Sequence, residues 1–395
     1  MTPGARAGAA IELLDEVIGS ARAGGPAADA LVARYFAKRR YAGSKDRRAV
    51  RELVYRAIRA SGAPPVDGRA ALLAVAAVDE SVGAAFDGSP HAPAPVAAGE
   101  LSVASDPLPG WLRDRFDPLV GEGERPALLS RAPLDLRANR LRAERGAALA
   151  ELAGEGAEPS PLSLLGVRLP GGTKVDGLPA WREGRVEVQD EGSQLVSLAC
   201  GARPGMTAVD LCAGAGGKTL ALAAEMANEG RIVAADANRD RLGKLPPRAA
   251  RAGATIAEPR LLDPHREAEM MADLAGVADL VLVDAPCSGS GTWRRNPETR
   301  WWLTPDRLAA LVALQARLLG VAAGLVRPGG TLVYVVCSLL AEEGRHQATA
   351  FARGRSAFVQ LDPGMEAGRS AGPGRLLTPA HDRTDGFFIA RWTAA

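Results

Sequence analysis

The chain passes from a strand into a helix within Val209-Asp210-Leu211-Cys212-Ala213-Gly214-Ala215-Gly216-Gly217-Lys218-Thr219. The apolar run before the glycines is typical of a buried strand, and glycines let the backbone pass close to a ligand. The helix that follows would present free N–H groups to that ligand at its N-terminus. The spacing of a phosphate-binding P-loop is missing, so the turn alone does not identify the ligand.

From residue 207 onward, strands and helices alternate, which predicts an α/β fold with a doubly wound, mainly parallel sheet. Because ligands bind beyond the carboxyl ends of parallel strands, the residues that end each strand are candidate site residues. The predicted strands are 207–212, 231–236, 279–284 and 331–337, and the predicted helices are 218–227, 239–252 and 305–326.

Three successive strands after the glycine turn end at an aspartate. Asp236 lies 20 residues after Gly216, Asp263 follows a less regular strand, and Asp284 ends the next one. An acid at the first of these positions binds ribose hydroxyls in Rossmann-type sites. Three acids facing one glycine turn favour a nucleoside-bearing ligand over a purely structural role.

Two of the cysteines follow predicted strands fifty positions apart, in Asp284-Ala285-Pro286-Cys287-Ser288-Gly289 and Val333-Tyr334-Val335-Val336-Cys337-Ser338. Both thiols are expected at one rim of the sheet, where a nucleophile belongs. These residues alone leave open which thiol attacks a substrate. Cys200 and Cys212 are expected to be small buried hydrophobes, and the absence of a Cys-x-x-Cys pair argues against structural zinc, so no metal is predicted.

The composition fits a globular protein of two or three domains, since 47% of the 395 residues are hydrophobic and 24% are charged. No uninterrupted apolar window of about 18 residues occurs and the first residues lack an apolar signal core, which predicts a cytoplasmic protein without a membrane partner. The net charge of +2 conceals a basic segment at 34–59, with ten Lys/Arg against two acids and four aromatic residues between them. This pattern suits a polyanion such as RNA, with a solvated helix face as the alternative.

The chain before residue 186 divides into three predicted parts. Helical spacing indicates an all-helical N-terminal region at 1–85, and a Pro- and Ala-rich stretch indicates a linker at 86–106. Mixed helix and strand patterns predict a small α+β module at 107–185. The α/β domain then covers 186–395.

Taken together, the motifs resemble those of the RsmB/NOL/NOP/Sun family of RNA cytosine-5 methyltransferases, and the pairing of Asp-Ala-Pro-Cys with a later Cys-Ser is specific to that family. One departure is Val336, where the family usually has threonine before the second cysteine. The segments that carry the resemblance are 189–194, 210–219, 284–291 with 294–297, 337–338 and 384–390.

The resemblance implies a Rossmann-like methyltransferase domain that uses S-adenosylmethionine, preceded by an RNA-binding module and a NusB-like helical region. It implies that Cys337 is the nucleophile that adds to C6 of cytosine, that Cys287 assists product release, and that Asp284 lies between cofactor and base. Asp236 would bind the ribose and Asp263 the adenine side of the cofactor. The residues expected to bind the cofactor are Cys212, Ala213, Gly214, Ala215, Gly216, Gly217, Lys218, Asp236, Asp263 and Asp284.

The expected activity is methylation of cytosine C5 in RNA, most directly 16S rRNA. A tRNA substrate would use the same chemistry and remains an alternative, as does a non-catalytic RNA-binding factor in ribosome assembly. Retention of both thiols together with Asp284 argues against the non-catalytic reading. Arg294 and Arg295, which follow the glycine-rich loop after Cys287, are candidates for RNA phosphate contacts.

Overall fold

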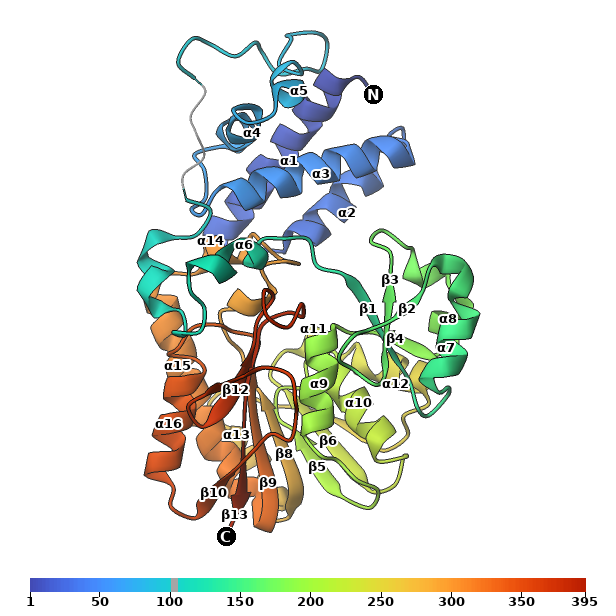
Figure 1. The fold of residues 1–395 in the computed structure, drawn as a ribbon, viewed down its shortest axis with the longest axis vertical. Coiled ribbons are helices and arrows are strands. Elements are labelled where there is room, and N and C mark those ends of the chain that lie inside the picture. Colours follow the sequence, from blue (N-terminus) through green and yellow to red (C-terminus); the bar gives the residue numbers. More distant parts are fainter. Residues whose placement is uncertain (101–105) are drawn as a thin grey trace. The chain divides into compact units, whose positions relative to one another are not determined.

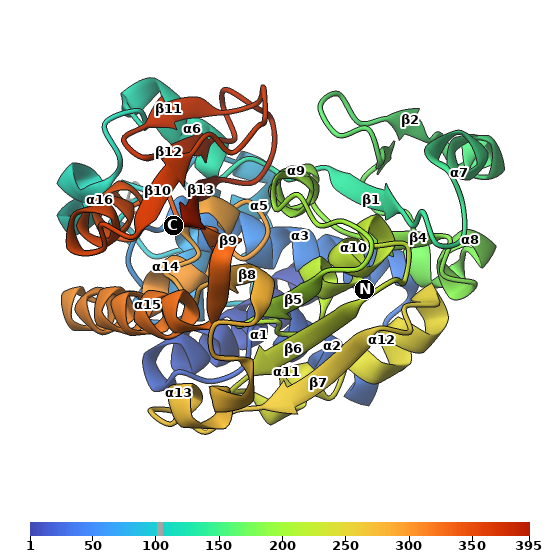
Figure 2. The same ribbon diagram turned by 90° about the horizontal axis from the view of Figure 1, so that it is seen from below.

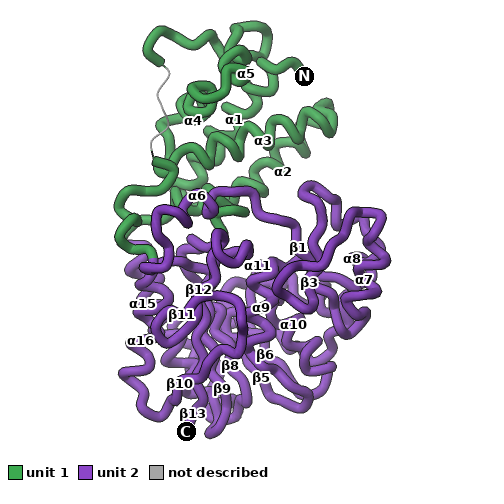
Figure 3. Tube along the Cα trace, in the orientation of Figure 1, with its two compact units in different colours: residues 1–116, 292–305 green, residues 117–291, 306–395 purple. Residues whose placement is uncertain are grey.

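A computed structural model describes residues 1–100 and 106–395. The chain forms two compact units, one made of residues 1–116 with 292–305 and one made of residues 117–291 with 306–395 (Figure 3). The predicted linker at 86–106 lies partly outside the described residues, because 101–105 are not described.

The first unit is a bundle of helices around a common apolar core, which confirms the all-helical N-terminal region. Segment 292–305 belongs to this bundle, since Trp301 is buried in its core. Arg300 and Trp301 both donate hydrogen bonds to the carbonyl of Ser61, which would otherwise lack a partner at the end of helix α3. The helices of this unit are α1 (Pro3–Ala23), α2 (Ala28–Lys38), α3 (Ser44–Ala60), α4 (Gly68–Ala76), α5 (Glu80–Gly83) and α14 (Thr299–Trp302).

The aromatic residues of the basic segment 34–59 mostly serve this core. Tyr35, Phe36 and Tyr55 are buried, whereas Tyr41 is 76% exposed. The interleaved aromatic pattern therefore reflects helix packing at three of its four positions, and Tyr41 is the exposed residue of the four.

The second unit begins with a small antiparallel sheet of order β2-β3-β1-β4, which confirms the predicted α+β module. Helices α7 and α8 accompany this sheet, and its core gathers around Leu136, Val167 and Val186. The elements of the module are β1 (Leu134–Ala138), α7 (Arg145–Glu151), β2 (Glu158–Pro159), β3 (Gly166–Leu169), α8 (Pro179–Arg182) and β4 (Val186–Val188), and α6 (Arg125–Leu128) precedes it.

The large sheet of the second unit confirms the predicted α/β fold and has the order β11-β12-β13-β9-β8-β5-β6-β7, with β10 paired to β13 (Figure 1). Strands β9, β8, β5, β6 and β7 pair in parallel, as predicted. Strand β13 pairs antiparallel with β9 and with β12. The strands are β5 (Thr207–Asp210), β6 (Arg231–Asp236), β7 (Ala257–Leu261), β8 (Ala278–Asp284), β9 (Val326–Val336), β10 (Phe358–Leu361), β11 (Arg369–Ala371), β12 (Gly374–Leu377) and β13 (Phe387–Ala394).

Helices cover both faces of this sheet, with α9 and α10 on one side and α15 on the other (Figure 2). Leu280 and Leu282 of β8 pack with α9, α10 and α12, while the alternate residues point to the opposite face. The helices are α9 (Glu191–Ala199), α10 (Gly217–Glu225), α11 (Arg239–Leu242), α12 (Leu245–Ala252), α13 (Glu267–Met270), α15 (Pro305–Leu325) and α16 (Arg345–Gly354). Among the described residues, α15 is long and apolar enough to cross a membrane, which is weak evidence because core helices of soluble proteins pass the same test.

Two element predictions require correction. The helix predicted at 239–252 is two helices, α11 and α12, because Pro246 and Pro247 lack an N–H and are tolerated only in a first helical turn. The antiparallel half of the sheet, β10 to β13, was not predicted, since its strands are short or follow glycine-rich turns.

Candidate active site

The structure brings the two strand-end cysteines together at the rim of the large sheet. Strands β8 and β9 run in parallel with Asp284 opposite Val335, so both chains leave the sheet at the same level. The Sγ atoms of Cys287 and Cys337 lie 3.4 Å apart, within reach of an S–H···S hydrogen bond. Both residues are partly exposed.

A lysine–aspartate ion pair lies at the same rim. Lys218 Nζ, on the first turn of α10, is 2.7 Å from Asp284 Oδ2 at the end of β8. Burial lowers the pKa of Lys218, but the negative charges of Asp284, Cys337 and Asp210 outweigh it and raise the pKa overall. The ammonium is therefore a fixed positive charge that faces both Asp284 and Cys337.

The two thiols differ in their surroundings. The pKa of Cys287 is raised well above the ordinary value, first by its hydrogen bond with Cys337, then by burial, and then by the charges of Cys337 and Glu343. Cys287 is therefore a protonated thiol at neutral pH. Either sulfur can be the donor in the S–H···S contact between the two thiols.

The glycine turn after β5 is held in place by the acid at the end of β6. Gly214 N donates to Asp236 Oδ2 and Asn238 N donates to Asp236 Oδ1, each at 2.7 Å. Gly214 and Gly216 have φ angles of 56° and 85°, in the left-handed region that favours glycine. A Cβ on Gly216 would lie 2.3 Å from Leu245 Cδ1, so the turn requires glycine there.

Asp210, the last residue of β5, is buried beneath this turn. Its Oδ2 accepts a hydrogen bond from Thr219 Oγ1 at 2.7 Å, and burial raises its pKa to about 7. Its Oδ1 is buried and has no hydrogen-bond partner among the described residues.

Cys212 and Cys200 differ in exposure. Cys200 is 1% exposed and its thiol donates to the Val196 carbonyl at 3.3 Å, as expected of a small buried hydrophobe. Cys212 is half-buried on the glycine turn, and burial raises the pKa of its thiol.

The remaining candidate residues are Asp263, Arg294 and Arg295. Asp263 is exposed beyond β7 and lies 3.4 Å from Arg266. Arg294 is 7% exposed and Arg295 is half-buried, and both belong to segment 292–305 of the first unit. Their contacts with cofactor and RNA stay predictions.

Sequence reasoning missed a buried carboxylate behind the two cysteines. Glu343 is fully buried and accepts hydrogen bonds from Ser288, Ser338 and Gln315. The available signal was the serine that follows each of the two cysteines. Each of the two serine hydroxyls requires a hydrogen-bond partner if it is buried.

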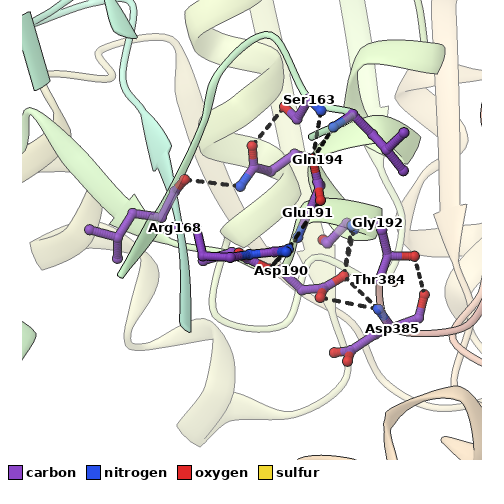
Figure 4. Close-up of polar contacts among 12 residues, drawn as sticks. Ser163, Arg168, Asp190, Glu191, Gly192, Gln194, Thr384 and Asp385 are labelled. Carbon is purple, nitrogen blue, oxygen red and sulfur yellow. Dashed lines mark hydrogen bonds and ion pairs between the residues drawn. The ribbon is translucent and has the colours of Figure 1, made fainter. Parts of the chain in front are cut away.

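The segment 189–194 contacts both the small sheet and the C-terminal segment 384–390 (Figure 4). Both segments are among those that carry the family resemblance. Asp190 caps α9 by accepting from Gly192 N, and it also accepts from Asp385 N at 3.2 Å. Glu191 accepts from Ser163 N at 2.8 Å and forms an ion pair with Arg168. These motif residues have a structural role within the second unit.

Within residues 1–100 and 106–395, the structure contains no group of three or more His, Cys, Asp or Glu side chains that could hold a metal ion.

Comparison with known proteins identifies a family over the large sheet. Residues 198–393 match the family described as 16S rRNA methyltransferase RsmB/F. The probable ribosomal RNA small subunit methyltransferase B of Synechocystis sp. is 36% identical over 298 residues, 72% of this chain and 66% of that protein. Ribosomal RNA small subunit methyltransferase B of Xanthomonas campestris pv. campestris is 35% identical over 307 residues, 74% of this chain and 68% of that protein. The chain spans about two thirds of the length of these relatives.

Solved structures show that the fold extends beyond the matched region. PH0851 superposes with a TM-score of 0.80 at 24% identity and covers 100% of this chain and 99% of its own. A methyltransferase homolog protein from Pyrococcus horikoshii has a TM-score of 0.61 at 27% identity, covering 69% of this chain and 90% of its own. NSun6 from the same organism, solved with SFG, has a TM-score of 0.64 at 20% identity, covering 72% of this chain and 98% of its own.

Proposed function

The chain belongs to the RsmB/F family of RNA cytosine-5 methyltransferases, and from that premise we propose that it methylates C5 of a cytosine in 16S rRNA through a covalent adduct on Cys337. S-adenosylmethionine supplies the methyl group. The observation that carries the proposal is the 3.4 Å approach of Cys287 and Cys337 beside the Lys218–Asp284 ion pair.

The glycine turn fits the proposed cofactor. Free N–H groups at the start of α10 suit a polar ligand group. Asp236, which accepts a hydrogen bond from Gly214 N on the turn, would bind the ribose hydroxyls. These groups would bind and orient the cofactor so that its methyl group faces the two thiols.

The proposed chemistry follows from the low nucleophilicity of cytosine C5. C5 attacks a methyl sulfonium only after electrons have been pushed into the ring. Cys337 supplies them when its Sγ forms a bond to C6, and the ammonium of Lys218 favours the thiolate that attacks. Asp284 would hydrogen-bond the N3/N4 edge and so stabilise the protonated ring in the adduct.

Release of the product reverses the addition. After C5 has formed its bond to the methyl group, a base removes the C5 proton and the electron pair re-forms the C5–C6 double bond as the Cys337–C6 bond breaks. Cys287 lies 3.4 Å from the departing sulfur and would assist this step. The target base has to leave any stack to reach these groups.

RNA is the proposed partner, and the cytoplasm the proposed location. The small sheet of the second unit and the basic segment of the first unit would contact the RNA backbone. In that segment Arg51 pairs with Asp29 and Arg56 pairs with Asp79, while Lys45 and Arg48 are exposed and suit phosphate contacts. A tRNA substrate would use the same active site and is separated from rRNA by the methyl-transfer assay described below.

The covalent step is tested with two cysteine variants and small-subunit rRNA. Cys337→Ala should abolish both methylation and the protein–RNA adduct, which appears as a slow band on a denaturing gel. Cys287→Ala should accumulate that band, because addition proceeds and release does not. Cys200→Ala, which removes a buried thiol outside the site, is the matched control. Turnover of Cys337→Ala at the control rate would refute the assignment.

A further inference from the structure

We propose that Glu343 is a positioning residue that fixes the two cysteine-bearing loops against each other and keeps the shared proton on Cys287, leaving Cys337 free to attack. The inference rests on the proposed function, because it concerns how the same two thiols divide their roles.

Glu343 contacts both loops directly. It is 0% exposed, its Oε1 accepts from Ser288 N at 2.8 Å, and its Oε2 accepts from Ser338 Oγ at 2.5 Å. Ser288 Oγ donates to Oε2 as well. Since Ser288 follows Cys287 and Ser338 follows Cys337, one carboxylate is shared by the residues next to both thiols.

A wider set of buried hydrogen bonds keeps this carboxylate in one orientation. Gln315 Nε2, on α15, donates to Glu343 Oε1 at 3.0 Å and to the Pro286 carbonyl at 2.9 Å. Tyr334 of β9 donates from its hydroxyl to the Glu343 carbonyl at 2.6 Å. Helix, strand and loop are therefore all bonded to Glu343, and its side chain has little freedom to move.

The serine hydroxyls complete the link between the loops. Ser290 Oγ lies 3.1 Å from Ser338 Oγ and 3.2 Å from Ser288 Oγ, and it accepts from Leu339 N at 2.9 Å. All three serine side chains are buried. Loss of the carboxylate would remove the shared acceptor of Ser288 and Ser338 and leave only the neighbouring serine hydroxyls, with a cost of about 1–3 kcal/mol for each buried group left unsatisfied.

The charge of Glu343 also separates the two thiols. The titratable groups that face Cys287 are Tyr334 from β9, and Cys337 and Glu343 from the segment that follows β9. They carry either no charge or a negative one, whereas Cys337 faces the ammonium of Lys218. These neighbours favour the protonated form of Cys287, and the cation lies on the side of Cys337.

The charge effect is tested by alkylation, which requires no methyl transfer. In the Cys337→Ala background, which removes the competing thiol, iodoacetamide labelling of Cys287 is followed against pH by mass spectrometry of its peptide. Adding Glu343→Gln should lower the midpoint of labelling by about one pH unit or more, because the amide has the same shape without the charge. An unchanged midpoint would overturn the charge role.

The positioning effect is tested in the full chain by kinetics. Glu343→Asp keeps the charge but is too short to reach both loops, so kcat should fall at least tenfold while KM for S-adenosylmethionine and RNA stays within twofold. Its labelling midpoint in the Cys337→Ala background should match that of the parent. Glu342→Gln removes a charge one residue earlier and serves as the control.

Each outcome of these experiments decides one part of the proposal. A Glu343→Asp variant with parental kcat would overturn the positioning role. If thermal unfolding of Glu343→Gln shows no cooperative transition, the variant is not folded, and Glu343→Asp still tests the positioning role. Ser338→Ala, which leaves the charge of Glu343 in place, should lower kcat without moving the labelling midpoint. If Glu343→Gln shifts the labelling midpoint in the Cys337→Ala background but the parent chain methylates no RNA, the charge role is supported and the proposed function is refuted.

Discussion

Replacement of Asp236 by asparagine should weaken the binding of S-adenosylmethionine by about 10- to 150-fold. Both carboxylate oxygens accept backbone hydrogen bonds, from Gly214 N on the glycine turn and from Asn238 N, each at 2.7 Å. Asparagine has a single acceptor oxygen, so one N–H loses a hydrogen bond to a charged group, worth about 1.5–3 kcal/mol. Because the cofactor binds the ordered turn, this loss lowers its affinity, and about 1.4 kcal/mol per factor of ten converts it to the 10- to 150-fold range.

Isothermal titration calorimetry of parent and variant with S-adenosylmethionine, in one buffer and at one salt concentration, measures the effect. Asp240→Asn is the matched control, because Asp240 is exposed on α11 and only four residues away. Thermal unfolding without cofactor shows whether the variant is folded. A dissociation constant for Asp236→Asn within twofold of the control value would refute the role of Asp236 in holding the cofactor turn.

Other positions give further predictions. Because burial raises the pKa of Asp210 from 3.8 to about 7, ionising this group destabilises the fold progressively as pH rises from about 4 to about 7. In urea titrations, the stability of Asp210→Asn relative to the parent should therefore increase between about pH 4 and about pH 7 and stay constant above that range, and a pH-independent difference would contradict this. Gly216→Ala should lose about 1–2 kcal/mol of unfolding free energy from its positive φ alone, and more from the contact with Leu245. Gly217→Ala, whose Cβ would meet open space, is the control and should not lose stability for these reasons. Equal thermal stability of the two variants would contradict the strain at Gly216. Arg295→Ala should reduce the slope of log RNA affinity against log salt by about one, and an unchanged slope would count against a phosphate contact.

The parallel part of the fold and the convergence of the two thiols were predictable because both depend on local patterns. Strand β6 was predicted with its observed bounds, and strand β8 to within one residue. Once the strands are parallel, Cys287 and Cys337 have to emerge at one rim. The resemblance supplies a proposed role for each of the two thiols, which the strand pattern alone does not.

The carboxylate behind the thiols could not be predicted in the same way. Glu343 receives its hydrogen bonds from Ser288, Ser338 and Gln315, which lie on three separate segments. A glutamate at 343 also fits an exposed position before a helix when only the sequence is considered. Its complete burial is a property of the tertiary fold.

The antiparallel half of the sheet escaped prediction for a related reason. Strands β11 and β12 have three and four residues and pair with each other around Gly372, which has a φ of 63°. Such short segments carry little periodicity. The pairing of β12 with β13, and that of β13 with β9, joins segments far apart in the sequence, which local propensity does not determine.

Transfer of labelled methyl from S-adenosylmethionine to total RNA, taken from a strain that lacks this protein, tests the proposed activity most directly. Small-subunit rRNA, large-subunit rRNA and tRNA are separated afterwards and the modified base is identified. We expect label as 5-methylcytosine in the small-subunit rRNA, and label in tRNA instead would correct the substrate. No label in any fraction, from a chain that still binds the cofactor, would contradict the proposed reaction.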